Sequence, residues 1–363
     1  MGRIGDLIAT CAPVRDWDTL EVRWRALEAR VPASFFQSWT WVGCLGPERF
    51  PDPWLLELRR AGETVGLALW NRRAGPVVPS FALQEAGMAA LDTPYVEHNG
   101  ILGAAAPAAF RAMLRGVRPR RLVLSGIDDA TLAAVRDATR WVRVLRSQPA
   151  PFLELGRDPL AGRSANTRAQ LRRSERAYGT VAVSRAATEA EAWAMLDELA
   201  ALHQARWEAR GQPGAFVRPF FRRFHRALIA AGLPRGEIDL LRVTGDGALV
   251  GLLYNFRYRG VAYAYQGGFA YEDASGARKP GLTCHLAAVR HAAAAGLVRY
   301  DFLAGDAQYK RSLSDGATML HWVEAGPGTL PAGLARALPA GLARALPAEL
   351  ARALPARLPR MLG

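Results

Sequence analysis

The chain has 363 residues, of which 50% are hydrophobic and 22% are charged. This length exceeds one typical domain and the composition is that of folded globular proteins, so together they exclude a largely disordered chain and predict two domains. The formal net charge is +14. The basic residues are scattered along the chain instead of forming one cluster. A general abundance of arginine therefore explains the positive charge better than a nucleic-acid-binding surface does, and there is no reason to expect a DNA partner.

The three cysteines, Cys11, Cys44 and Cys284, are odd in number and too widely spaced for a disulfide framework or a zinc site. We therefore expect a reducing, cytoplasmic setting and no metal. The N-terminal residues lack the apolar core of a secretory signal, and no uncharged apolar run reaches the ~20 residues that a membrane span needs. Any membrane association is expected to be peripheral, at the inner membrane surface.

Residues 1–150 predict a first α/β unit. Apolar spacing predicts a helix over 17–31, and Ser38 is a candidate N-cap for the aromatic turn that follows. The next elements are a hairpin with strands at 54–59 and 65–70, a strand or approach loop at 95–102, helices at 107–116 and 128–138, and strands at 121–125 and 141–147.

A polar joint at 147–151 is predicted to separate this unit from a second one over 151–326. The second unit predicts helices at 166–178, 188–210, 218–231 and 281–295, and strands at 180–184, 239–243, 248–258, 261–269, 298–303 and 320–324. Both units follow the order helices, hairpin, strand, helix, strand. This order indicates mixed α/β sheets flanked by helices, and a structural duplication is a hypothesis that it raises.

Residues 327–363 form a tail of different composition, in which Leu-Pro-Ala-Gly-Leu-Ala-Arg-Ala recurs every eight residues from Leu330. A proline in each repeat interrupts any long helix, so the tail is predicted to be disordered or to form short helices. An amphipathic Leu/Arg arm for an anionic membrane or a protein partner is the alternative.

Lys279 and Lys310 are the only lysines of the chain, and the other 45 basic residues are arginines. Lys279-Pro280-Gly281 opens a predicted helix, where free backbone N–H groups and the positive end of the helix dipole suit a phosphate. An ordinary helix start explains the same residues equally well.

Three further groups combine polar chemistry with glycines or with a strand end. Tyr265 and Gln266 precede two strand glycines, which often mark a bulge or a backbone that lies close to a ligand. An ordinary strand end rich in aromatic residues would give the same pattern. His203 and Trp207 share one helix face, where a histidine is more often packed than catalytic. The last group follows a strand directly, in the kind of loop that favours function, and contains Asp306, Tyr309 and Lys310.

Five stretches of the second unit match the motifs of a known protein family: Leu202 to Trp207, Phe220 to His225, Tyr265 to Phe269, Lys279 to Gly281, and Tyr300 to Lys310. With these motifs in this order, residues from about 165 to 312 resemble the GNAT-fold acyltransferase branch that includes CelD-type cellulose-biosynthesis proteins, which is distantly similar to the Fem-type aminoacyl transferases. The resemblance implies two GNAT-like lobes side by side, with mixed, largely antiparallel sheets. It also implies direct attack of an amine or a hydroxyl on the thioester of acetyl-CoA or another acyl-CoA.

The resemblance also implies roles for single residues. Tyr309 would protonate the leaving thiolate, and Asp306 or His203 would act as the base. Lys310→Ala and Tyr309→Phe are expected to leave folding intact and to remove transfer. The cofactor-binding residues would be Gln266, Lys279, Gly281, Leu282 and Lys310, and the acceptor-binding residues Arg206, Trp207 and Tyr265.

The helix-start sequence Arg278-Lys279-Pro280-Gly281-Leu282-Thr283 keeps one glycine of the usual Gln/Arg-x-x-Gly-x-Gly/Ala loop, which leaves the acyl donor open. The acceptor is expected to be a sugar, a polysaccharide or a cell-envelope precursor. Two alternatives stay open. The first is a non-catalytic scaffold of an exopolysaccharide-synthesis complex. The second is a Fem-like transferase that takes its acyl group from aminoacyl-tRNA, so tRNA is a possible but less favoured partner.

Overall fold

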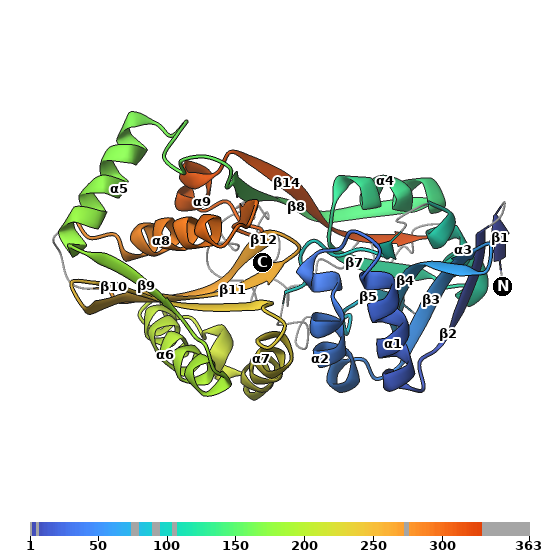
Figure 1. Ribbon diagram of the computed structural model, residues 1–363. Coiled ribbons are helices and arrows are strands. Elements are labelled where there is room, and N and C mark those ends of the chain that lie inside the picture. The colour runs from blue at the N-terminus through green and yellow to red at the C-terminus, as the bar shows by residue number, and fades with distance from the viewer. Residues whose placement is uncertain are drawn as a thin grey trace, which may run out of the picture.

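The computed structural model describes residues 2–4, 7–73, 80–88, 95–103, 107–271 and 276–328. Two lobes lie side by side, joined by two long strands (Figure 1). The predicted tail at 327–363 lies outside the described residues except for its first two positions. No helix among the described residues has the length and the apolar character of a membrane span.

From residue 17 onward the first lobe keeps the predicted order of helices and strands, and it adds strands at 2–4, 7–13 and 80–83 that were not predicted. Its hairpin turns at Ala61 and Gly62, whose φ angles of 48° and 86° match a tight two-residue turn. Ser38 caps the second helix as predicted, because its Oγ accepts the N–H of Trp41. The elements are β1 (Gly2–Ile4), β2 (Leu7–Pro13), α1 (Trp17–Glu28), η1 (Phe35–Gln37), α2 (Trp39–Arg49), β3 (Pro53–Arg60), β4 (Glu63–Arg73), β5 (Ser80–Leu83), β6 (Leu102–Gly103), α3 (Pro107–Val117), β7 (Arg121–Ile127) and α4 (Asp129–Ala138).

The second lobe repeats that order of helices, hairpin, strand, helix and strand. Its hairpin turns at Asp246 and Gly247, with φ angles of 46° and 83°, and Gly179 ends the first helix at a φ of 70°. The elements are α5 (Ala165–Tyr178), β9 (Val181–Arg185), α6 (Glu189–Glu208), η2 (Ala215–Val217), α7 (Pro219–Gly232), β10 (Ile238–Gly245), β11 (Ala248–Tyr258), β12 (Val261–Phe269), α8 (Pro280–Ala294), β13 (Arg299–Asp301) and α9 (Gln308–Leu313).

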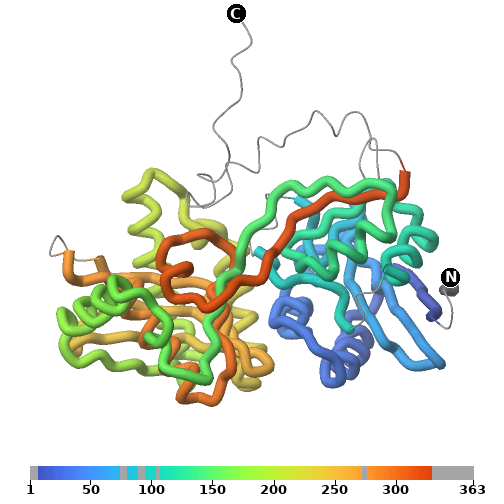
Figure 2. Tube along the Cα trace, turned by 90° about the horizontal axis from the view of Figure 1, so that it is seen from above, coloured from blue at the N-terminus to red at the C-terminus, as the bar shows by residue number. Residues whose placement is uncertain are grey.

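Two strands exchange between the lobes. β8 (Trp141–Glu154) leaves the first lobe and pairs through residues 152–154 with β13, while β14 (Gly316–Gly326) leaves the second lobe and pairs with β7. β8 and β14 also pair with each other from Trp141–Gly326 to Phe152–Gly316, and Figure 2 shows the two running together from one lobe to the other. The result is an α/β fold with one mixed sheet of parallel and antiparallel strands, in the order β1-β2-β3-β4-β5-β7-β14-β8-β13-β12-β11-β10-β9.

This exchange corrects the prediction of a polar joint at 147–151, because these residues lie inside β8. Pro149 and Pro151 have no N–H to donate, which favoured a loop at the level of sequence. Their carbonyls are nevertheless used, since Pro151 O accepts from Phe302 N at 2.8 Å and Pro149 O from Gly305 N at 2.9 Å. The segment that follows β13 is thereby held on β8.

A continuous aromatic core also joins the lobes. The ring of Phe35 stacks on that of Phe256 with centroids 4.1 Å apart, and Trp41 meets Phe224 at 5.1 Å. Glu28 accepts a hydrogen bond of 2.6 Å from the hydroxyl of Tyr258 across the same boundary. Because these contacts are buried, they hold the two lobes in one relative position.

Candidate active site

A cavity opens where two parallel strands of the second lobe separate. β12 and β13 pair only from Val261–Arg299 to Tyr263–Asp301, and the chain after Asp301 turns toward β8. The register between β11 and β12 skips Tyr265, so a bulge bends β12 away at the same level. Residues of β12 and of the segment after β13 line the resulting cavity of about 460 Å³.

Both lobes contribute to the walls. The cavity is lined by Tyr95 and Glu97 of the first lobe, by Arg146 and Gln148 of β8, by the end of α6 and the segment up to Arg218, by β12, by the start of α8, and by Phe302 to Lys310.

Most of the predicted site residues meet in this cavity. The lining includes Tyr309, Asp306, His203, Gln266, Gly281, Leu282, Lys310, Arg206, Trp207 and Tyr265. Lys279 is not among the residues that line it. Its Nζ donates to Gln170 Oε1 at 3.0 Å and its N–H donates to Ser174 Oγ at 2.9 Å, so this exposed lysine fixes the start of α8 against α5.

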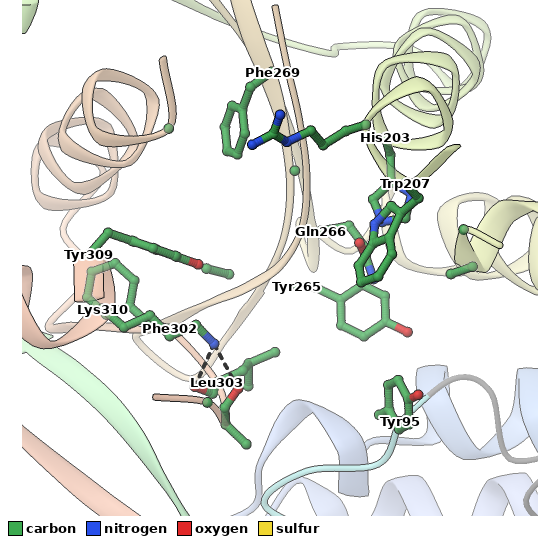
Figure 3. A pocket seen from close by; sticks show the side chains of 18 of the residues that line it. Tyr95, His203, Trp207, Tyr265, Gln266, Phe269, Phe302, Leu303, Tyr309 and Lys310 are labelled. Carbon is green, nitrogen blue, oxygen red and sulfur yellow. Dashed lines mark hydrogen bonds between the residues drawn. The ribbon is translucent and has the colours of Figure 1, made fainter. Parts of the chain in front are cut away.

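Tyr309 reaches from α9 toward the middle of the cavity (Figure 3). Its ring stacks on the imidazole of His285 with centroids 4.8 Å apart and planes 16° from parallel. Burial, with a further contribution from the charge of Lys310, lowers the pKa of His285 to about 3, so this imidazole is neutral near pH 7. His285 therefore orients the phenol without placing a positive charge against it.

Lys310 was predicted to bind a phosphate, and in the structure its ammonium group contacts two backbone carbonyls. Its Nζ donates to Leu303 O at 3.1 Å and to Ala304 O at 2.8 Å (Figure 3). Leu303 has a φ of 59°, a conformation that costs energy for a branched side chain. The ammonium group thus holds a strained turn at the wall of the cavity.

The two predicted bases are poorly suited to accept a proton. His203 Nε2 already accepts a hydrogen bond of 2.7 Å from Trp207 Nε1, which confirms that the two share a helix face. Burial lowers the pKa of His203 to about 4, which makes it a weak base near pH 7. Asp306 is exposed at the rim and forms an ion pair with Arg311.

Glu97 is a partly buried carboxylate that sequence reasoning missed. Its Oε2 accepts the N–H of Ala304 at 2.5 Å, which fixes it beside the segment after β13. Burial raises the pKa of Glu97, although the nearby Lys310 acts in the opposite direction. A charged residue inside the predicted strand or loop at 95–102 was the available signal, but nothing in the sequence places that loop against the second lobe.

The cavity is positively charged. Among the described residues, its lining carries five cationic side chains, Arg146, Arg206, Arg210, Arg218 and Lys310, against the two carboxylates of Glu97 and Asp306. Such a cavity attracts anionic molecules. No group of three or more His, Cys, Asp or Glu side chains in the described part of the chain is arranged to hold a metal ion.

Residues 163–311 match the family described as acetyltransferase (GNAT) domain. They form a GNAT acyltransferase domain. This family indicates an enzyme with an acyl-CoA co-substrate. No curated protein matches the chain.

Solved structures confirm the predicted tandem fold. FemX has a TM-score of 0.59 at 11% identity, covering 88% of this chain and 97% of FemX. The C-terminal domain of a putative lysylphosphatidylglycerol synthetase from Agrobacterium fabrum has a TM-score of 0.56 at 12% identity, covering 86% and 93%. L-PGS from Bacillus licheniformis has a TM-score of 0.53 at 11% identity, covering 86% and 94%.

Gly281 and Leu282, in the first turn of α8, line the cavity. A Cβ atom added at Gly281 would lie 3.5 Å from Phe269, an ordinary contact, so the fold itself would accept a side chain there. The glycine keeps this side of the cavity open beside the first-turn N–H groups of Gly281 and Leu282.

Proposed function

We propose that the protein transfers an acyl group, in the first place acetyl, from its CoA thioester to an amine or hydroxyl of a sugar, a polysaccharide or a cell-envelope precursor. One observation carries the proposal. The cavity at the separation of β12 and β13 has a helix N-terminus at Gly281 on one side and a partly buried carboxylate, Glu97, on another.

The donor would bind along the second-lobe side. The N–H groups at Gly281 and Leu282 and the dipole of the 15-residue helix α8 suit a pyrophosphate. The edge of β12 that β13 leaves offers backbone groups for the amides of the pantetheine arm. Arg206, whose guanidinium lies 4.3 Å from the ring of Tyr271, adds positive charge nearby.

The chemistry we assign is a direct displacement. The nucleophile attacks the thioester carbon while its proton passes to the carboxylate of Glu97. The carbon–sulfur bond breaks, and the thiolate takes the phenolic proton of Tyr309, which solvent later replaces. General acid and base assistance of this kind contributes roughly 10²–10⁴-fold.

Glu97 replaces Asp306 and His203 as the proposed base. A carboxylate works best as a base when its pKa approaches the working pH, and burial moves the pKa of Glu97 in that direction. Its hydrogen bond to Ala304 N leaves it oriented, whereas the exposed Asp306 is held by Arg311 at the rim.

A Fem-like transfer from aminoacyl-tRNA is the second candidate. It is favoured by the fold, since FemX, the domain of the putative lysylphosphatidylglycerol synthetase and L-PGS share it at TM-scores above 0.5. It also gives the positive charge of the cavity a role.

Titration calorimetry with acetyl-CoA and longer acyl-CoAs, and with uncharged and aminoacylated tRNA, separates these functions. Binding of a thioester and release of free CoA in the presence of amino sugars support the proposal. Strongly salt-dependent binding of tRNA without binding of any thioester supports the Fem-like route. Binding of neither supports a non-catalytic scaffold.

A further inference from the structure

We propose that the acceptor carries both an amine and an anionic group, and that Arg146 of β8 binds the anion while the amine faces Glu97. This inference rests on the proposed acyl transfer and names the class of its acceptor.

Arg146 presents donors that the described residues leave unused. Its guanidinium lies over the ring of its cross-strand neighbour Trp322, with Cζ 3.7 Å from the ring centroid, and this cation–π contact helps to hold the side chain in place. Nε and Nη1 are buried and have no hydrogen-bond partner among the described residues. Because unpaired buried donors are costly, an anion that accepts from them gains more than it would from an exposed arginine.

Gln148 extends the same polar surface. It lies two residues beyond Arg146 on β8, so both side chains leave the same face of the strand and both line the cavity. Gln148 is only 9% exposed, and within the described part of the chain its Oε1 has no hydrogen-bond partner. Because an amide oxygen only accepts, Gln148 Oε1 suits an N–H or O–H group of a ligand whose anion is bound by Arg146.

This anion site is distinct from the one proposed for the donor phosphates. Arg146 lies near enough to Tyr95 and Glu97 to interact with them electrostatically, whereas Gly281 lies beside Phe269. Figure 3 shows Tyr95 and Phe269 on opposite sides of the cavity, with Tyr309 and Tyr265 between them. One anion on Arg146 and another at the start of α8 therefore occupy different ends.

The charges around Arg146 select the rest of the acceptor. Glu97 and Glu85 carry negative charge close enough to attract the guanidinium through space. An acceptor with two negative groups would place one of them near Glu97, while a neutral acceptor would leave the buried Arg146 donors unpaired. A molecule with an amine for Glu97 and one anion for Arg146 complements both.

The test uses three amines that share one parent: glucosamine, glucosamine 6-phosphate and muramic acid, which adds a carboxylate. Their binding to the full chain is measured by calorimetry, and release of CoA from acetyl-CoA is measured with each. The variants are Arg146→Gln, Arg146→Lys and, as a control on the same strand outside the cavity, Arg143→Gln; melting temperatures report folding.

We expect at least one anionic amine to bind roughly 10- to 100-fold more tightly than glucosamine, as loss of hydrogen bonds to a charged group implies. Arg146→Gln should abolish this preference, Arg146→Lys should keep part of it, and Arg143→Gln should keep all of it. The affinity for acetyl-CoA should stay unchanged in all three variants. Preference for glucosamine 6-phosphate assigns a phosphate, and preference for muramic acid assigns a carboxylate.

Equal or absent binding of all three amines by the wild-type protein overturns the inference. So does weaker binding of acetyl-CoA by a folded Arg146→Gln protein, because Arg146 would then serve the donor. Binding of an anionic amine through Arg146 without any release of CoA counts against the proposed acyl transfer and leaves the anion site standing.

Discussion

Nε2 of His98 lies 3.1 Å from Oδ2 of Asp301, and this buried ion pair joins the two lobes directly behind the cavity. Its neighbours in sequence, Glu97 and Phe302, line the cavity wall. His98 has a φ of 46°, an uncommon backbone conformation that the pair helps to hold. The pair therefore positions the proposed base relative to the end of β13.

The ion pair predicts a pH-dependent stability. Burial lowers the pKa of His98, but the Asp301 carboxylate outweighs it, so the pKa in the folded protein lies above the ordinary 6.5. A raised pKa means that the stabilisation is complete below about pH 6.5 and is lost as the pH rises through the folded-state pKa. We expect His98→Gln to cost roughly 1–3 kcal/mol at low pH and progressively less at high pH. Melting temperatures of both proteins from pH 5.5 to 9 measure this difference, and a difference independent of pH would contradict it.

Tyr309→Phe isolates the phenolic proton. The variant keeps the ring that stacks on His285, so we expect an unchanged melting temperature and an unchanged KM for acetyl-CoA. Loss of the proton donor should lower kcat roughly 10²–10⁴-fold. Steady-state release of CoA measures this, and a variant that turns over at the wild-type rate would remove the acid role of Tyr309.

Glu97→Gln tests the base that the first lobe supplies. We expect kcat to fall roughly 10²-fold or more, because the amide cannot accept the proton. In the wild-type protein, activity should rise with pH as Glu97 deprotonates, with a midpoint above the ordinary glutamate pKa of 4.5 since burial raises it. This rising limb should be absent from the variant. Asp306→Asn, at the exposed rim, is the matched control, and its activity should still rise with pH. A rise that persists in Glu97→Gln and is lost in Asp306→Asn would make Asp306 the base.

The contacts of Lys310 change the expectation for Lys310→Ala. The ammonium donates to two carbonyls of the turn at Leu303 and Ala304, so its removal should lower stability by roughly 1–3 kcal/mol as well as activity. Denaturant unfolding of Lys310→Ala beside the exposed-site variant Lys279→Ala measures this. Equal stability of the two variants would argue that Lys310 serves a ligand instead of the turn.

The local part of this fold could be predicted from the sequence. The hairpin turns at Ala61-Gly62 and Asp246-Gly247 and the cap at Ser38 depend on neighbouring residues, and the structure confirms them. The six-residue helix α9 was not predicted, because so short a segment has little periodicity. The strand predicted at 298–303 ends at Asp301, where the chain turns to β8.

The long-range part could not be predicted. Pro149 and Pro151 favour a loop locally, and only their pairing with β14 and with the segment after β13 makes them part of a strand. The second-lobe residues of the cavity were predicted through motifs in one stretch of sequence. Glu97 and Arg146 were missed because they reach the cavity through the packing of the lobes and the exchange of β8, neither of which leaves a local pattern.

The central claim is that the start of α8 binds an acyl-CoA. Calorimetric titration of acetyl-CoA into the wild-type protein, Gly281→Leu and Gly156→Leu tests it most directly. Gly156 is an exposed position with open space around it and does not line the cavity, so it serves as the matched control. We expect binding by the wild-type and Gly156→Leu proteins, and affinity at least about tenfold weaker in Gly281→Leu, whose side chain would enter the phosphate side of the cavity. Absence of binding by the wild-type protein, or equal binding by all three, would contradict the claim.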